Sequence, residues 1–178
     1  MHTYFSLIIG AFALLTGTAF LFFMVFSKNN SKRVHIIVSV LFAMTAMVSW
    51  LLNFGWIRFI MTLLFIPVIH SIAFIIINNR SASYMDCSAK LKRYVTLSYI
   101  TYLSGYLLFP DGGDVGQMYL FFGLIRSNTI AELCYFPTVL LFTANIALLV
   151  LQSKERKKIL QISIDKWVLT RVKLIYRK

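Results

Sequence analysis

One histidine stands in the middle of a long apolar segment, where an ionisable side chain is expensive to bury. His70 is the twelfth residue of the uncharged stretch 59–77, and Ser71 follows it. These side chains could carry protons, bind a small polar ligand or hydrogen-bond to a neighbouring helix. The Ser71 hydroxyl can also bond to the carbonyl of Pro67, four residues back. Because helix contacts alone explain a single histidine, we favour a packing role.

A stripe of polar side chains follows another apolar segment, 91–109. Its members recur at helical spacing, so they share one face. Such a face is costly against lipid and is expected to point toward other helices or a wet cavity. The sequence leaves open whether this face serves helix packing or a ligand pocket. The predicted polar centre consists of His70, Ser71, Ser98, Thr101, Tyr102 and Asn145.

The other reactive side chains do not converge on a catalytic set. Cys87 follows His70 by seventeen residues and falls in an expected loop, whereas His70 lies about two helical turns inside its segment. Asp111 and Asp114 flank two glycines and form a possible site in an outer loop, but Asp-Gly turns explain the same residues. We expect no catalytic residue, no metal and no cofactor.

The composition requires elements that cross a membrane. Hydrophobic residues make up 59% of the 178 residues and charged residues 13%, against about 25% in an ordinary soluble domain. This excludes a soluble enzyme, a disordered chain and a disulfide scaffold. A membrane span takes about 20 apolar residues. Five segments qualify, namely 5–26, 34–54, 59–77, 91–109 and 130–151.

The basic residues indicate an orientation. The chain has 18 Lys and Arg against 6 Asp and Glu. If five spans alternate, sixteen basic residues fall on one side and only Arg58 and Arg126 on the other. The positive-inside rule then places the N-terminus outside and the C-terminus in the cytoplasm. Because the charges lie in loops and the tail, we expect contact with anionic lipid and do not expect nucleic-acid binding.

Two outer features complete the predicted bundle. Residues 55–58 form a tight turn between two spans, with Trp50 and Trp56 in an aromatic belt that Tyr106 joins. The apolar stretch 117–125 is too short to cross a membrane, so we expect an interfacial or re-entrant segment on the outer side.

The C-terminal tail, 152–178, carries nine basic and two acidic residues. Its apolar residues recur on one broad helical face, which predicts an amphipathic helix on the inner leaflet. Alternation in 160–164 also fits a strand. The basic side chains expected to face lipid are Lys154, Arg156, Lys157, Lys158, Lys166 and Lys173.

The predicted fold is all-α, with five transmembrane helices in domain 1–151 and one surface helix in the tail 152–178. Small residues in the first span indicate close packing against another helix or subunit. They are Ser6, Gly10, Ala13 and Gly17.

The absence of a convergent catalytic set favours a small, non-enzymatic protein of a bacterial-type inner membrane. It would act through contacts with lipid, with another membrane protein or with its own copies, as accessory, regulatory and immunity proteins do. The alternative is a small transporter or channel component built around His70. An intramembrane enzyme is the last hypothesis. In a transporter the polar centre must surround a cavity. In an accessory protein the same side chains pack against each other without water between them.

Overall fold

The computed structural model describes residues 32–52, 55–110 and 117–175, and this part of the chain is mostly helical. The all-α prediction is confirmed. The first predicted span and its small-residue stripe (Ser6, Gly10, Ala13 and Gly17) lie outside the described residues, as do Asp111 and Asp114. The elements are α2 (Lys32–Leu52), α3 (Trp56–Leu63), α4 (Ile66–Ala82), the 3-10 turn η1 (Met85–Cys87), α5 (Ala89–Leu108), β1 (Tyr119–Leu120), β2 (Ile125–Arg126) and α6 (Asn128–Ile175).

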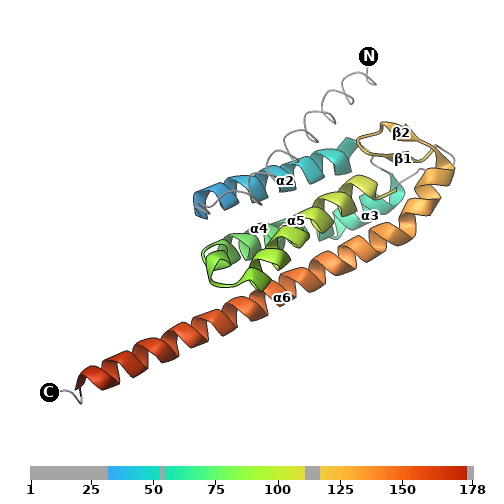
Figure 1. Ribbon diagram of the computed structural model, residues 1–178. Coiled ribbons are helices and arrows are strands. Elements are labelled where there is room, and N and C mark those ends of the chain that lie inside the picture. The colour runs from blue at the N-terminus through green and yellow to red at the C-terminus, as the bar shows by residue number, and fades with distance from the viewer. Residues whose placement is uncertain (1–31, 53–54, 111–116, 176–178) are drawn as a thin grey trace.

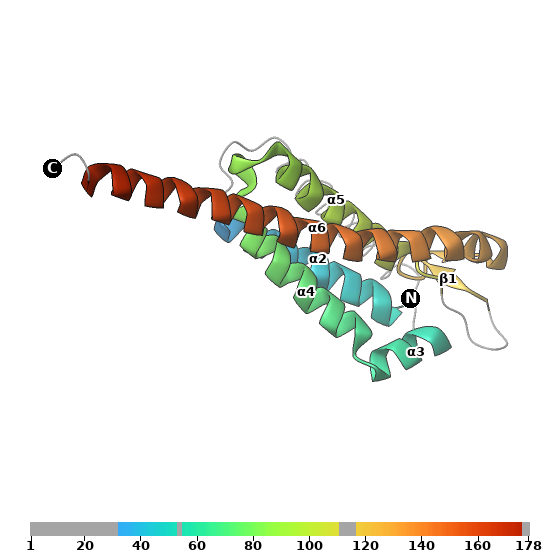
Figure 2. The same ribbon diagram turned by 90° about the horizontal axis from the view of Figure 1, so that it is seen from below.

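The helices α4 and α5 lie between α2 and α6 (Figures 1 and 2). Buried aromatic rings fill the space that α2, α4 and α5 share. Phe74 of α4 stacks on Tyr102 of α5 with ring centroids 3.9 Å apart, and Phe42 of α2 meets Tyr99 edge-on at 5.1 Å. This aromatic core holds α5 at the centre of the bundle.

Two of the described helices are long and apolar enough to cross a membrane, within Val34–Leu52 and Asn128–Leu169. The pair α3 and α4 adds a third candidate if the two helices form one broken span. The described residues therefore give two or three candidate spans, and the prediction of five is not confirmed. The helix α5 covers the predicted fourth segment but is not among the candidates, since Lys, Ser, Thr and Tyr dilute its apolar residues.

The predicted third span is not one straight helix. It breaks between α3 and α4 with a bend of 66°, and Phe65 at the break has the left-handed φ of 55°. Pro67 follows in the first turn of α4. Proline has no N–H and fits most easily in the first turn of a helix, so Pro67 is well placed at the start of α4.

The fifth predicted span and the tail form one helix. The 48 residues of α6 pass the expected boundary at 151 and 152 without a break, and the helix extends beyond the bundle (Figures 1 and 2). The predicted tail helix is thus continuous with the helix of the fifth predicted span, and the strand alternative for 160–164 is wrong. Lys, Glu, Arg, Gln and Leu dominate the junction, and these residues favour helix.

The apolar stretch expected to lie at the membrane interface forms a small β-hairpin. Its strands β1 and β2 pair antiparallel, with Tyr119 opposite Arg126. Three residues of the turn have positive φ, namely Phe121, Phe122 and Gly123. Leu120 and Phe122 are buried, so the hairpin folds back onto the end of α5.

Arg58 does not lie in an outer loop, so this prediction from the sequence is wrong. The helix α3 begins at Trp56, and the Arg58 side chain is 0% exposed. Its guanidinium donates to the carbonyls of Ser49 at 2.8 Å and Trp50 at 3.0 Å, and also to that of Phe109. It lies over the rings of Trp50 and Phe109, with centroid distances of 5.0 and 5.4 Å.

These carbonyls belong to helix ends, where the backbone has no intrahelical partner. Ser49 and Trp50 lie in the last turn of α2, and Phe109 ends α5. The carbonyls of Leu107 and Leu108 are bound in turn by the Phe121 N–H at 3.1 Å and the Thr138 hydroxyl at 3.1 Å. A cation at two helix C-termini also matches their negative dipole ends. Arg58 therefore ties α2, α3 and α5 together.

We expect Arg58→Lys to destabilise the folded protein although the charge is kept. An ammonium lacks the planar fork that serves three carbonyls at once, and each buried carbonyl left without a donor costs about 1–3 kcal/mol. Unfolding of the purified protein in micelles by increasing SDS measures this cost. Arg126→Lys, at an exposed arginine of β2, is the matched control and should change stability by about 0.5 kcal/mol or less. Equal stability of the two variants would contradict the role of Arg58.

Candidate functional site

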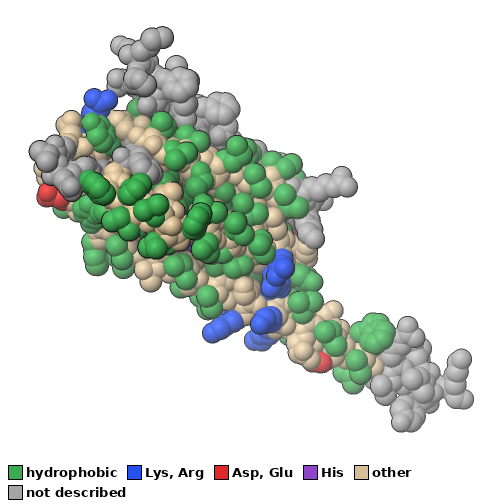
Figure 3. Space-filling view, turned by 180° about the vertical axis from the view of Figure 1, so that it is seen from behind, with side chains coloured by type: hydrophobic (Ala, Val, Ile, Leu, Met, Phe, Trp, Pro, Cys, Tyr) green, Lys and Arg blue, Asp and Glu red, His purple; other side chains and the backbone are tan. Residues whose placement is uncertain are grey.

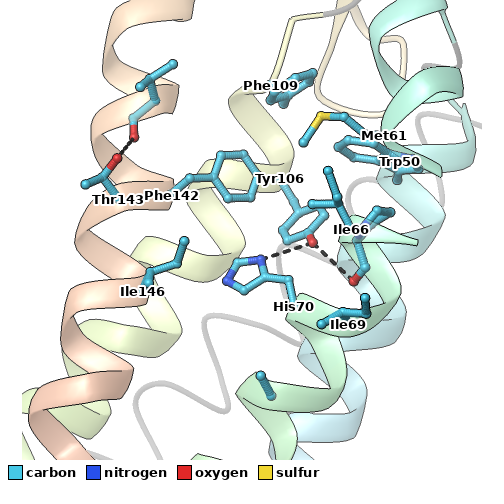
Figure 4. A pocket seen from close by; sticks show the side chains of 13 residues that line it. Trp50, Met61, Ile66, Ile69, His70, Tyr106, Phe109, Phe142, Thr143 and Ile146 are labelled. Atoms are coloured by element: carbon cyan, nitrogen blue, oxygen red, sulfur yellow. Dashed lines mark hydrogen bonds between the residues drawn. The ribbon is translucent and has the colours of Figure 1, made fainter. Parts of the chain in front are cut away.

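His70 lies near the start of α4 and faces both α5 and α6. Its Nε2 lies 2.9 Å from Oδ1 of Asn145. Its Nδ1 lies 3.2 Å from the Tyr106 hydroxyl, as Figure 4 shows. The Asn145 amide nitrogen donates to the Ser98 carbonyl at 2.6 Å and to the Thr101 hydroxyl at 3.0 Å. Oδ1 of Asn145 is thus the acceptor that faces His70, so the ring proton belongs on Nε2. In the neutral ring, Nδ1 then accepts from Tyr106.

Serine and tyrosine hydroxyls extend this network between α4 and α5. The Ser71 hydroxyl donates to the Pro67 carbonyl at 2.6 Å. The Tyr102 hydroxyl lies 2.7 Å from the Ser71 hydroxyl. Pro67 has no N–H and accepts the bond from Ser71 within the first turn of α4, as the spacing predicts. The Ser98 hydroxyl lies 2.9 Å from Oδ1 of Asn78. Each of these polar groups has a partner inside the chain.

The structure thus places the six residues of the predicted polar centre together, between α4, α5 and α6. Ser98, Tyr102 and Asn145 are fully buried, and Ser71 is nearly so. Thr101 and His70 are half-buried. The stripe on α5 therefore points into the bundle and bonds to side chains of α4 and α6.

A cavity of about 480 Å³ lies beside His70, between α3, α4 and α6 (Figure 4). Among the residues of the polar centre, only His70 lines it. The Thr143 hydroxyl also faces the cavity and already donates to the Val139 carbonyl at 2.8 Å. The rest of the wall is apolar or aromatic and includes Met61, Ile69, Phe142 and Ile146.

Two aromatic side chains of the site lie where the sequence does not predict them. The sequence predicts Tyr106 and Trp50 in an outer aromatic belt, but both are buried, and Trp50 donates from Nε1 to the Thr62 hydroxyl at 2.9 Å. Tyr106 follows Tyr102 by four residues and so continues the same helical face. That spacing could have added Tyr106 to the predicted polar centre. The position of Trp50 has no comparable signal, because its partner comes from α3.

The remaining candidates lie away from this site. Cys87 is exposed in η1, at the opposite end of α4 from His70. Within the described ranges, no three His, Cys, Asp or Glu side chains gather in a group that could hold a metal ion. The basic tail residues lie on α6, where blue side chains gather beyond the bundle (Figure 3). Lys154, Lys157, Lys158 and Lys166 are exposed, Arg156 is half-buried, and the side chain of Lys173 lies outside the described part.

Comparisons with known proteins give no relative of this chain. No protein-family model matches it, and neither does a curated protein or a solved structure.

We expect His70→Gln to keep the fold, because a glutamine amide can donate to Asn145 and accept from Tyr106. His70→Leu should lose about 1–2 kcal/mol, since it removes the partner of a buried amide oxygen. The measurement is SDS unfolding of each purified variant in micelles. If Gln destabilises the protein as much as Leu, the hydrogen bonds to Asn145 and Tyr106 do not explain the contribution of His70 to stability.

Proposed function

We propose that this chain is a multi-pass protein of a bacterial-type cell membrane that acts without catalysis, as an accessory, regulatory or immunity-like protein. It has five spans, with the N-terminus outside and the C-terminus in the cytoplasm. The candidate spans in α2, α6 and the α3–α4 pair support the membrane location. The sixteen basic residues on one side and two on the other support the orientation.

The observation that carries the proposal is the closed polar centre. His70, Asn145 and Ser98 bond to groups of the same chain, and the latter two are fully buried. A transporter needs polar groups that are free to replace the water around a passing solute. Here those groups are already engaged, so the centre serves to hold the helices.

What remains for interaction is the outer surface of the bundle. Apolar side chains cover much of the face seen in Figure 3. On α6, Leu133 and Phe136 are 72% exposed, more than most other apolar residues of the bundle. An apolar surface of this kind suits lipid chains and the helices of another membrane protein or a second copy. This favours action through helix contacts.

The tail supports a second contact, with anionic lipid. Lys154, Lys157 and Lys158 follow directly after the apolar part of α6 and are exposed. At the end of a span these ammonium groups reach the headgroups of the inner leaflet. Farther along, Ile164 and Trp167 are also exposed.

The small-transporter hypothesis keeps one observation in its favour, because His70 lines the cavity. A route for a polar solute would need water at the centre of the bundle. Whether water reaches Ser98 therefore separates the two functions.

Single cysteines test both the orientation of the chain in the membrane and the absence of water from the polar centre, after both native cysteines are replaced by alanine. Cysteines at Gly113, Asn29 and Ser153 are probed in intact cells with an impermeant thiol reagent. We expect labelling only at Gly113. Ser98→Cys, which changes the side-chain volume little, should resist even a small, permeant, water-soluble reagent until SDS unfolds the protein.

The opposite results have distinct meanings. Labelling at Ser153 but not at Gly113 would invert the orientation, and labelling at both would contradict five spans. Labelling of Ser98→Cys in the folded protein would reveal water in the centre and favour the transporter.

A further inference from the structure

We propose that the cavity beside His70 binds one hydrocarbon chain of a bilayer lipid, which enters sideways between α4 and α6. This inference rests on the membrane location proposed above. It assigns a class of ligand to the cavity, which the proposed action through helix contacts does not require.

The cavity is built by the backbone. The 66° bend turns α3 away from the line of α4, and side chains on both sides of the bend, Met61 and Ile66, line the hollow. Phe65 at the bend has φ 55°, a conformation that is strained for a residue other than glycine. The hollow thus lies where the backbone changes direction between α3 and α4.

The entrance of the cavity lies on the outer surface of the bundle, between α4 and α6. Ile69 on α4 and Val139 and Ile146 on α6 line the cavity and are 62%, 59% and 56% exposed. In a bilayer these apolar side chains contact lipid tails, so hydrocarbon is the medium next to the entrance. A volume of about 480 Å³ is within the range of ligand sites. An apolar hollow left empty forfeits the dispersion contacts of its walls.

The walls favour a chain without polar groups. Both ring nitrogens of His70 are bonded, to Tyr106 and Asn145, and the Thr143 hydroxyl donates to Val139. A polar ligand would have to break these bonds. The aromatic walls, Trp50, Tyr106, Phe109 and Phe142, instead offer ring faces and edges to methylene groups.

The shape favours a lipid chain over a helix of a partner protein. The lining residues of α6 extend from Val139 to Ile146, about 10 Å along the helix. A helix is itself about 10 Å wide and buries its side chains along several turns. A short, partly enclosed hollow fits a flexible chain better.

The test uses the purified full chain in phosphatidylcholine–phosphatidylglycerol vesicles that contain a phospholipid with a diazirine on one acyl chain. After irradiation, mass spectrometry locates the lipid adducts. We expect them to concentrate on lining residues such as Phe142 and Ile146. Ala73→Phe should lower these adducts about fivefold, because the new ring fills the cavity. Ala147→Phe, an exposed position on α6 outside the lining, is the matched control and should leave them unchanged.

Ile69→Trp provides a second variant, which narrows the entrance from an exposed position and does not crowd the core. It should lower the same adducts. Equal adducts on the cavity lining in wild type, Ala73→Phe and Ile69→Trp would overturn the inference. Adducts spread evenly over exposed side chains such as Ile72 would also overturn it.

Carbonate extraction of the cell membranes separates the two possible failures. A chain released by carbonate would contradict the membrane location and this inference together. A chain that stays in the membrane without adducts in the cavity would contradict this inference alone.

Discussion

The hydrogen bond between His70 and Asn145 joins α4 to α6, and the same asparagine amide binds α5 through Ser98 and Thr101. In an apolar bundle, a polar group that meets no partner costs more than the bond itself gains. The polar side chains of the centre therefore favour the arrangement of the three helices in which they meet each other. That arrangement fixes the rotation of each helix, and the aromatic core packs around it.

The same constraint acts at the helix ends. The last carbonyls of α5 are bound by a hairpin N–H, by Thr138 of α6 and by Arg58 of α3. Arg58 also reaches the end of α2, so one side chain closes two helix ends. The bend between α3 and α4 sets the place of α3 and opens the cavity beside His70. The polar centre, the capped ends and the cavity are thus parts of one arrangement.

Local pattern predicted the features that depend on local spacing. The apolar segments 34–54 and 91–109 predicted the positions of α2 and α5, although α5 is too polar to be a candidate span. The four-residue spacing from Pro67 to Ser71 predicted their hydrogen bond. The sequence predicts Arg58 in an outer turn, because its acceptors lie near residues 50 and 109 and only the fold brings them together. The hairpin at 117–125 and the continuity of α6 were missed for a related reason. Both depend on which neighbouring element hydrogen-bonds to the backbone N–H and C=O groups, and apolar periodicity carries no such information.

The central claim is that His70 and Asn145 stabilise the bundle through each other. A double-mutant cycle with His70→Leu, Asn145→Leu and the double variant measures this directly, by SDS unfolding in micelles. The claim predicts a coupling of about 0.5–1.5 kcal/mol, because the second substitution removes a group that has already lost its partner. If the double variant instead loses the full sum of the two single losses, the two side chains act independently and the claim is contradicted.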